Sequence, residues 1–276
     1  MSESVSFDRA AGYYDRTRAL SEELMSRTIA LLVDELPRDG RCLEIGIGTG
    51  RIALPLIRHG VDVVGADLSR EMMLRLRENA GDAVVPLVQA DATRLPFRTG
   101  AFTSALASHV LHLIPHWREA VDELIRVVRP GGLLIVLRGA RGRTRDQGVR
   151  EDDPWHQRIR RRFFVEAGNP SWPPGLDSMD ELDERMKEVA SVHELPELME
   201  EGTSTINELM RALEEGWWAA CWSIDEQTRK SAAATARAWA EREYGDLDER
   251  RPTLGGSTWR AYRLTRAGAA GTPPTG

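Results

Sequence analysis

The chain has 276 residues, of which 41% are hydrophobic and 29% are charged, and its formal net charge is −6 at pH 7. This length and composition are those of one elaborated globular domain, and the acidic balance argues against a general nucleic-acid-binding protein. The N-terminus lacks the basic and then apolar pattern of a signal peptide, and no run approaches the length of about 18 apolar residues that a membrane span needs. The sequence therefore indicates a cytoplasmic protein without a membrane span.

Short β-branched runs alternate with helical patterns between residues 41 and 139, which is typical of a parallel sheet with crossover helices. Helices are expected at 51–60, at 69–81 with Ser69 as the N-cap, and at 116–130, where Pro130 would stop the helix. Strands are expected at 41–46, 61–67, 83–91, 101–109 and 131–139.

Beyond residue 139 the strands thin out and the charge rises, and residues 141–150 have the composition of a linker. Helices are expected at 153–168, at 178–190 and, as an amphipathic pair, between Thr205 and Tyr244; strands are expected at 191–198 and 257–264. We divide the chain into an N-terminal cap helix (1–30), a core (31–139), a helical substrate cap that includes the sixth strand (140–250), a final strand (251–266) and a disordered tail (267–276).

A glycine-rich turn, LEIGIGTGR, joins the first strand to the next helix at residues 43–51. Glycine lets the backbone approach a ligand there, because it lacks a Cβ and accepts positive φ. The spacing of Gly46, Gly48 and Gly50 is one residue tighter than the GxGxxG of dinucleotide-binding folds. This spacing weakens the case for a bound pyrophosphate.

Acidic residues accompany this turn. Asp67 ends the second strand, where its carboxylate could accept hydrogen bonds from both ribose hydroxyls of either NAD or an adenosyl group. Asp91 ends the third strand and could accept a hydrogen bond from the exocyclic amine of adenine. Together with Glu44, they make three carboxylates without a phosphate cradle, which favours a cationic, phosphate-free ligand.

These motifs resemble the class I S-adenosylmethionine-dependent methyltransferases, and within them the ubiquinone-biosynthesis-like, type 11 or type 25 group. The resemblance covers residues 7–138 and rests on FDRAAGYYDRTR, LEIGIGTG, GADLS, QADATRLPF, HVLHLIPHW and RVVRPGGLLIV, in the family's order. It implies a Rossmann-like, seven-stranded, mostly parallel sheet flanked by helices, with a helical cap inserted late in the chain. The implied activity is in-line transfer of a methyl group from S-adenosylmethionine to an O, N or C atom of a small-molecule acceptor.

The resemblance also implies roles for residues around the cofactor's methionine and ribose. Gly46, Gly48 and Gly50 would line the methionine part, with Glu44 acting at the turn. Asp67 would hold the ribose.

Adenine contacts follow in the same way from the resemblance. Leu68 and Met72 would flank the ring, and Asp91 and Ala92 would read its amino edge. Met72 stands in an apolar helical pattern, so a place in the core explains it equally well.

At the sulfonium end, the resemblance implies that Ser108 and His109 face the reacting group. Tyr14 and Arg18 would belong to an N-terminal helix that closes over the cofactor, although Tyr14 could also be a packed helix aromatic.

A general base is needed only if the acceptor must lose a proton. His109 is our candidate, because it follows the fourth strand near the expected methyl group and imidazole titrates near neutrality. A structural role for this histidine is the alternative. Other histidines considered as bases are His112, His116, His156 and His193.

The choice of acceptor is expected to depend on residues 1–30 and 140–250, which are additions to the common fold. Aromatic residues gather in the second addition and suit a lid over an apolar or aromatic molecule, or else simply dock helices: Trp155, Phe163, Phe164, Trp172, Trp217, Trp218, Trp222 and Trp239. A basic cluster could meet an anionic acceptor or an RNA backbone, or could be a solvated helix face: Arg138, Arg141, Arg143, Arg145, Arg158, Arg160, Arg161 and Arg162.

Several other site types lack support in the sequence. Cys42 and Cys221 stand in apolar stretches and are expected to be buried free thiols. The histidines form no metal-binding pattern, and neither a GxSxG elbow nor a GKS/T phosphate loop is present.

The alternatives kept open are an RNA or protein methyltransferase and a non-catalytic S-adenosylmethionine-binding module. An NAD-dependent oxidoreductase is disfavoured by the glycine spacing and Asp91. Neither the acceptor nor the oligomeric state follows from the sequence.

Overall fold

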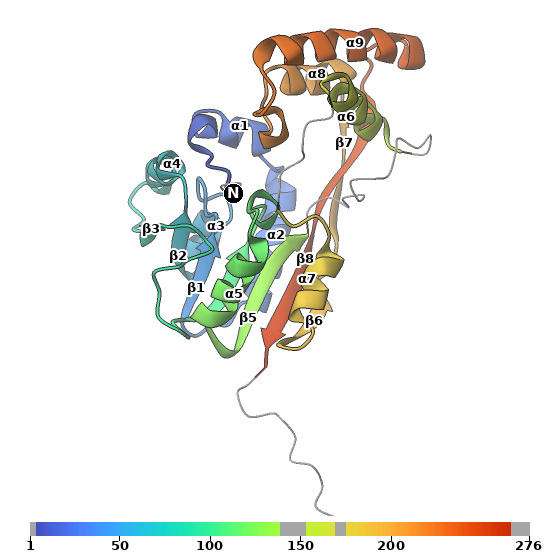
Figure 1. The fold of residues 1–276 in the computed structure, drawn as a ribbon. Coiled ribbons are helices and arrows are strands. Elements are labelled where there is room, and N and C mark those ends of the chain that lie inside the picture. Colours follow the sequence, from blue (N-terminus) through green and yellow to red (C-terminus); the bar gives the residue numbers. More distant parts are fainter. Residues whose placement is uncertain (1–3, 139–152, 169–174, 266–276) are drawn as a thin grey trace, which may run out of the picture. The chain divides into compact units, whose positions relative to one another are not determined.

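A computed structural model describes residues 4–138, 153–168 and 175–265 of the chain (Figure 1). The described residues form two compact units. The first lies within Met1–Gly142, Gly175–Leu198 and Ser257–Gly276, and the second lies within Arg143–Pro174 and Met199–Gly256. Residues 175–198 lie in the same unit as residues 31–138.

The first unit is built on a mostly parallel sheet with the strand order β3-β2-β1-β4-β5-β8-β6 (Figure 1). Strands β1 to β5 pair in parallel, whereas β8 is antiparallel to both β5 and β6. The strands are β1 (Arg41–Ile45), β2 (Asp62–Asp67), β3 (Leu87–Gln89), β4 (Phe102–Ala107), β5 (Val128–Arg138), β6 (Ala190–Glu194) and β8 (Arg251–Leu264). The Rossmann-like, mostly parallel sheet expected from the sequence is confirmed.

An eighth strand, β7 (Leu198–Ser204), pairs with β8 and was not predicted. Its sequence, LMEEGTS, has neither a β-branched run nor a clean alternation, and most of its residues are exposed. It extends because β8 supplies its hydrogen-bonding partner, and β8 begins at Arg251, where the division of the chain also starts the final strand. Pairing between distant segments therefore set this part of the sheet.

Helices follow the predicted pattern in both units, and Ser69 Oγ caps α4 by accepting a hydrogen bond from Met72 N at 3.1 Å, as expected. The expected helix at 116–130 is wrong at its end: α5 stops at Val127, and Val128 already pairs with Phe102 of β4. The helices of the first unit are α1 (Tyr14–Arg18), α2 (Glu22–Glu35), α3 (Ala53–Arg58), α4 (Arg70–Ala80), α5 (Trp117–Val127) and α7 (Met179–Met186). Those of the second unit are α6 (Trp155–Glu166), α8 (Ile206–Glu214) and α9 (Glu226–Tyr244).

Helices cover both faces of the sheet. Helices α5 and α7 pack on one face, where Leu43 and Ile45 of β1 join the core. Helices α2 and α3 pack on the other face, against Cys42 of β1 and Leu133 of β5. Because neighbouring strand residues point to opposite faces, one short buried strand contributes to both cores.

The second unit has its own helical core, formed by α6, α8 and α9. Cys221 is buried there, as Cys42 is in the sheet, and both are free thiols as expected. Arg158 of α6 pairs with Glu243 at 2.7 Å and lies over the rings of Trp239 and Tyr244. Part of the basic and aromatic cluster therefore contributes to packing within this unit. Trp172, the arginines at 141, 143 and 145, the linker at 141–150 and the tail at 267–276 lie outside the described residues.

None of the helices in the described ranges combines the length and the apolar character that a bilayer crossing requires.

Candidate cofactor-binding site

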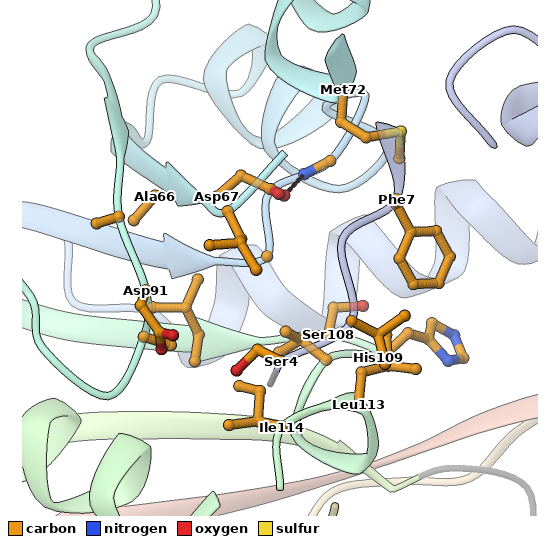
Figure 2. A pocket seen from close by; sticks show the side chains of 18 of the residues that line it. Ser4, Phe7, Ala66, Asp67, Met72, Asp91, Ser108, His109, Leu113 and Ile114 are labelled. Atoms are coloured by element: carbon orange, nitrogen blue, oxygen red, sulfur yellow. Dashed lines mark hydrogen bonds between the residues drawn. The ribbon is translucent and has the colours of Figure 1, made fainter. Parts of the chain in front are cut away.

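A pocket opens in the first unit at the carboxyl ends of β1, β2 and β4 (Figure 2). It contains about 690 Å³ of empty space, part of which is open to solvent. Ligands usually bind at this edge of an open α/β sheet. The parallel order of the strands thus places the site.

Most of the predicted site residues meet at this pocket. Its lining includes Tyr14, Gly46, Gly48, Asp67, Leu68, Met72, Asp91, Ala92, Ser108 and the candidate base His109. Arg18, Glu44 and Gly50 are not part of the lining. The roles that we gave to all of these residues stay predictions.

The glycine turn has the backbone conformation that glycine favours, with φ of 61° at Gly46, 57° at Gly48 and 83° at Gly50. A Cβ on Gly50 would lie 2.8 Å from Cγ of Leu54, so this glycine permits close packing of the turn on α3. A Cβ on Gly48 would instead meet Cε of Met72 at 3.3 Å, inside the pocket lining. A side chain at position 48 would therefore take up space in the pocket, whereas Gly50 serves the packing of the turn.

Asp67 is held by two backbone donors. Gly48 N donates to its Oδ2 and Ser69 N donates to its Oδ1, each at 2.8 Å, and Figure 2 shows the first bond. Burial raises the pKa of Asp67 in spite of these hydrogen bonds. Because a carboxylate oxygen can accept more than one hydrogen bond, both oxygens keep capacity for hydroxyl donors in the pocket.

Asp91 has one occupied and one available oxygen. Its Oδ1 accepts hydrogen bonds from Thr93 N at 2.9 Å and from Thr93 Oγ1 at 2.8 Å. No side chain or backbone donor among the described residues bonds to Oδ2. The Asp–Thr turn thus fixes the carboxylate while leaving one oxygen for an amine donor.

Glu44 lies just behind the pocket and is 2% exposed. Its Oε2 has no hydrogen-bond partner among the described residues. Burial, with a smaller contribution from Asp67, raises the pKa of Glu44 to about 8, and Arg51 opposes the rise. A cation placed nearby would favour the ionised carboxylate.

His109 follows β4 with φ of 54°, the one described residue other than glycine with positive φ. Desolvation by the surrounding protein, followed by Arg51, His112 and Arg18, lowers the pKa of His109. The side chain is solvent-exposed at the pocket, which weakens the desolvation, yet every cause favours the neutral imidazole at pH 7.

The other candidate histidines differ from His109 in their burial and in their place in the fold. Burial and Arg18 lower the pKa of His112, which lies in the short 3₁₀ turn Leu111–Leu113 after His109. His116 and His193 are exposed and lie beside Glu119 and Glu35. His156 belongs to the second unit.

Sequence reasoning missed the N-terminal residues that reach the pocket. Ser4, Val5 and Phe7 line it, and Phe7 meets Tyr14 edge to face with 6.0 Å between ring centroids. In the view of Figure 2, Phe7 and His109 are seen on the right of the pocket and Asp91 on the left. The spacing of Phe7 and Tyr14 within FDRAAGYYD was the available signal.

Comparison with known proteins places this geometry in a family. A family described as "Methyltransferase domain" matches residues 43–136. The chain is 35% identical over 142 residues to a demethylmenaquinone methyltransferase of Clavibacter sepedonicus, covering 48% of this chain and 56% of that protein. It is 36% identical over 138 residues to a phosphatidylethanolamine N-methyltransferase of Cereibacter sphaeroides, covering 49% and 66%. The chain thus spans 56% of the length of the first relative and 66% of the length of the second.

Solved structures are similar over more of the chain. The YcgJ protein of Bacillus subtilis matches with a TM-score of 0.57 and 19% identity, covering 88% of this chain and all of that one. A SAM-dependent methyltransferase from Thermotoga maritima matches with a TM-score of 0.53 and 17% identity, covering 94% and 98%. At these identities the likeness shows the fold alone. Residues 43–136 thus contain a methyltransferase domain, and the solved structures share the fold of the chain.

Proposed function

We propose that the protein transfers the methyl group of S-adenosylmethionine to an O, N or C atom of a small molecule. The observation that carries this proposal is the convergence of Asp67, Asp91 and the glycine turn on one pocket at the carboxyl edge of the sheet. The pocket offers carboxylate acceptors for an adenosine, and the described residues that line it include no cluster of cationic side chains that would hold phosphates.

The residues present fit the two ends of the cofactor. Asp67 would accept from the ribose hydroxyls, and Asp91 Oδ2 would accept from the adenine amine, with Leu68 and Met72 beside the ring. At the other end, the unpartnered carboxylate of Glu44 lies behind the turn that would hold the methionine part. A buried carboxyl without a partner is costly, so a positively charged ligand close to it is favoured.

When bound, the cofactor supplies an electrophilic methyl group on a sulfonium and leaves as a neutral thioether. The chain's own part is to position the acceptor and to exclude water, because an in-line displacement depends mainly on orientation. Phe7, Tyr14, Leu113 and Ile114 supply apolar surface to the pocket. His109 would accept a proton through its neutral imidazole where the acceptor has one to lose.

We further propose an apolar or aromatic acceptor. The apolar residues Val5, Val110, Leu113 and Ile114 in the pocket lining support it, as do relatives named for demethylmenaquinone and phosphatidylethanolamine. The net charge of −6 argues against RNA as the acceptor.

Calorimetry tests the cofactor first. We expect S-adenosylmethionine and S-adenosylhomocysteine to bind and NAD not to bind; failure of both adenosyl ligands would overturn the proposal. Incubating the protein with methyl-labelled cofactor, a metabolite extract and, separately, RNA then identifies the acceptor class. Label in the RNA fraction alone would contradict a small-molecule acceptor.

A further inference from the structure

Residues 4–18, here called the N-terminal segment, are attached to the first unit by two carboxylates. Asp8 lies at the start of α4 and accepts hydrogen bonds from Ser69 Oγ at 2.6 Å and from Glu71 N at 3.2 Å. Asp15 accepts from Thr49 Oγ1 at 2.5 Å and from Asn79 Nδ2 at 3.0 Å. The segment between and before these points supplies Phe7, Tyr14 and two other lining residues to the pocket.

The Asp8 attachment fixes the direction of the Ser69 hydroxyl. Ser69 Oγ accepts from Met72 N to cap α4, and its single proton is donated to Asp8 Oδ1. Ser69 is fully buried, so a hydroxyl proton without an acceptor would be costly there. Asp8 thus completes the cap of α4 from a segment more than 60 residues away in the chain.

Ser69 also contacts the ribose carboxylate of the proposed site. Its backbone N donates to Asp67 Oδ1 at 2.8 Å, while Gly48 N holds the other oxygen. One buried serine therefore links the carboxylate of Asp8 to the carboxylate of Asp67, through its side chain on one side and its main chain on the other. The α4 N-terminus, whose free N–H groups favour negative charge, accommodates both.

We propose that Asp8 is a positioning residue that couples docking of the N-terminal segment over the pocket to the orientation of Asp67. The proposal rests on the function proposed above, because it takes Asp67 as the group that holds the ribose. Docking places Phe7 at the pocket and, through Ser69, fixes the carboxylate that the ribose meets. Binding of an adenosyl ligand is then tightest when the segment is docked.

Titration calorimetry with S-adenosylhomocysteine and with adenosine tests the coupling. We expect Asp8→Ala to weaken both ligands about 10-fold, the effect of losing one charge-assisted hydrogen bond. Asp8→Asn keeps an oxygen that can accept from Ser69 and should recover part of this loss. Glu71→Gln is the matched control: it removes a carboxylate from the same helix start, but that carboxylate pairs with Arg70 and is half exposed.

A double-mutant cycle separates this role from a merely structural one. If Asp8 acts through Asp67, adding Asp8→Ala to Asp67→Asn should cost far less affinity for adenosine than it costs in the wild type. Additive losses would overturn the proposal, and so would an Asp8→Ala affinity equal to that of the wild type. Because Asp8 is exposed, both Asp8 variants should fold, and circular dichroism checks this.

Trypsin cleavage within the segment gives a second measurement. S-adenosylhomocysteine should slow cleavage after Arg9 and Arg16, which are exposed, in the wild type and in Glu71→Gln but not in Asp8→Ala. Equal protection in Asp8→Ala would contradict the coupling. A wild type that binds no adenosyl ligand overturns the proposed function itself, whereas a binding wild type with an unaffected Asp8→Ala overturns this inference alone.

Discussion

Replacing Glu44 by Gln should make the stability of the first unit less dependent on pH. The buried carboxyl of the folded protein has its pKa raised from an ordinary value near 4.5 to about 8, mainly by burial. Between these two values the folded state holds a proton that the unfolded state has released, so stability falls as pH rises through this window. Each pH unit within this window lowers the free energy of unfolding by at most about 1.4 kcal/mol, so the total loss of stability is at most about 5 kcal/mol.

Urea unfolding without ligand at pH 5.5, 7 and 9 measures this effect. The wild type should lose several kcal/mol relative to Glu44→Gln as the pH rises, with the difference levelling off above about pH 8. Glu78→Gln, which removes an exposed carboxylate paired with Arg75, controls for net charge and should follow the wild type. Equal pH dependence of the wild type and Glu44→Gln would refute the claim that burial keeps this carboxyl protonated.

Three further substitutions test the site and the turn. Asp67→Ala should lose at least 10-fold in affinity for S-adenosylhomocysteine by calorimetry while its circular dichroism stays that of the wild type, and unchanged affinity would remove the ribose assignment. His109→Gln should lower kcat about 100-fold at and above pH 7. At these pH values the lowered pKa of His109 keeps the imidazole of the wild type neutral, so the wild-type kcat should not change with pH. An unaltered kcat and pH profile in the variant would exclude His109 as the base. Gly50→Ala should cost more stability in urea than Gly60→Ala: both glycines have positive φ, but only the added Cβ at position 50 meets Leu54, so equal losses would contradict the packing argument.

Local patterns were enough for most elements of the fold. The alternation of strands and helices between residues 41 and 139 follows from side-chain periodicity, which repeats within a few residues. Ser69 as a cap was likewise readable, because a cap needs only the next three residues. The errors lie where a partner distant in sequence decides. Val128 leaves α5 early because β4 lies beside it, and β7 is extended because β8 pairs with it.

In the candidate site, too, some features follow from the sequence and others depend on contacts in the folded chain. The sequence by itself determined the fold class and brought Asp67, Asp91 and the glycine turn to one pocket, because parallel strands carry their carboxyl ends to the same edge. Only the tertiary structure decided that Phe7 lines this pocket, that Gly50 packs against Leu76 of α4 and that Glu44 is buried without a hydrogen-bond partner among the described residues. These properties depend on contacts between segments tens of residues apart, and on the loss of water around a side chain. Neither leaves a periodic trace in the sequence.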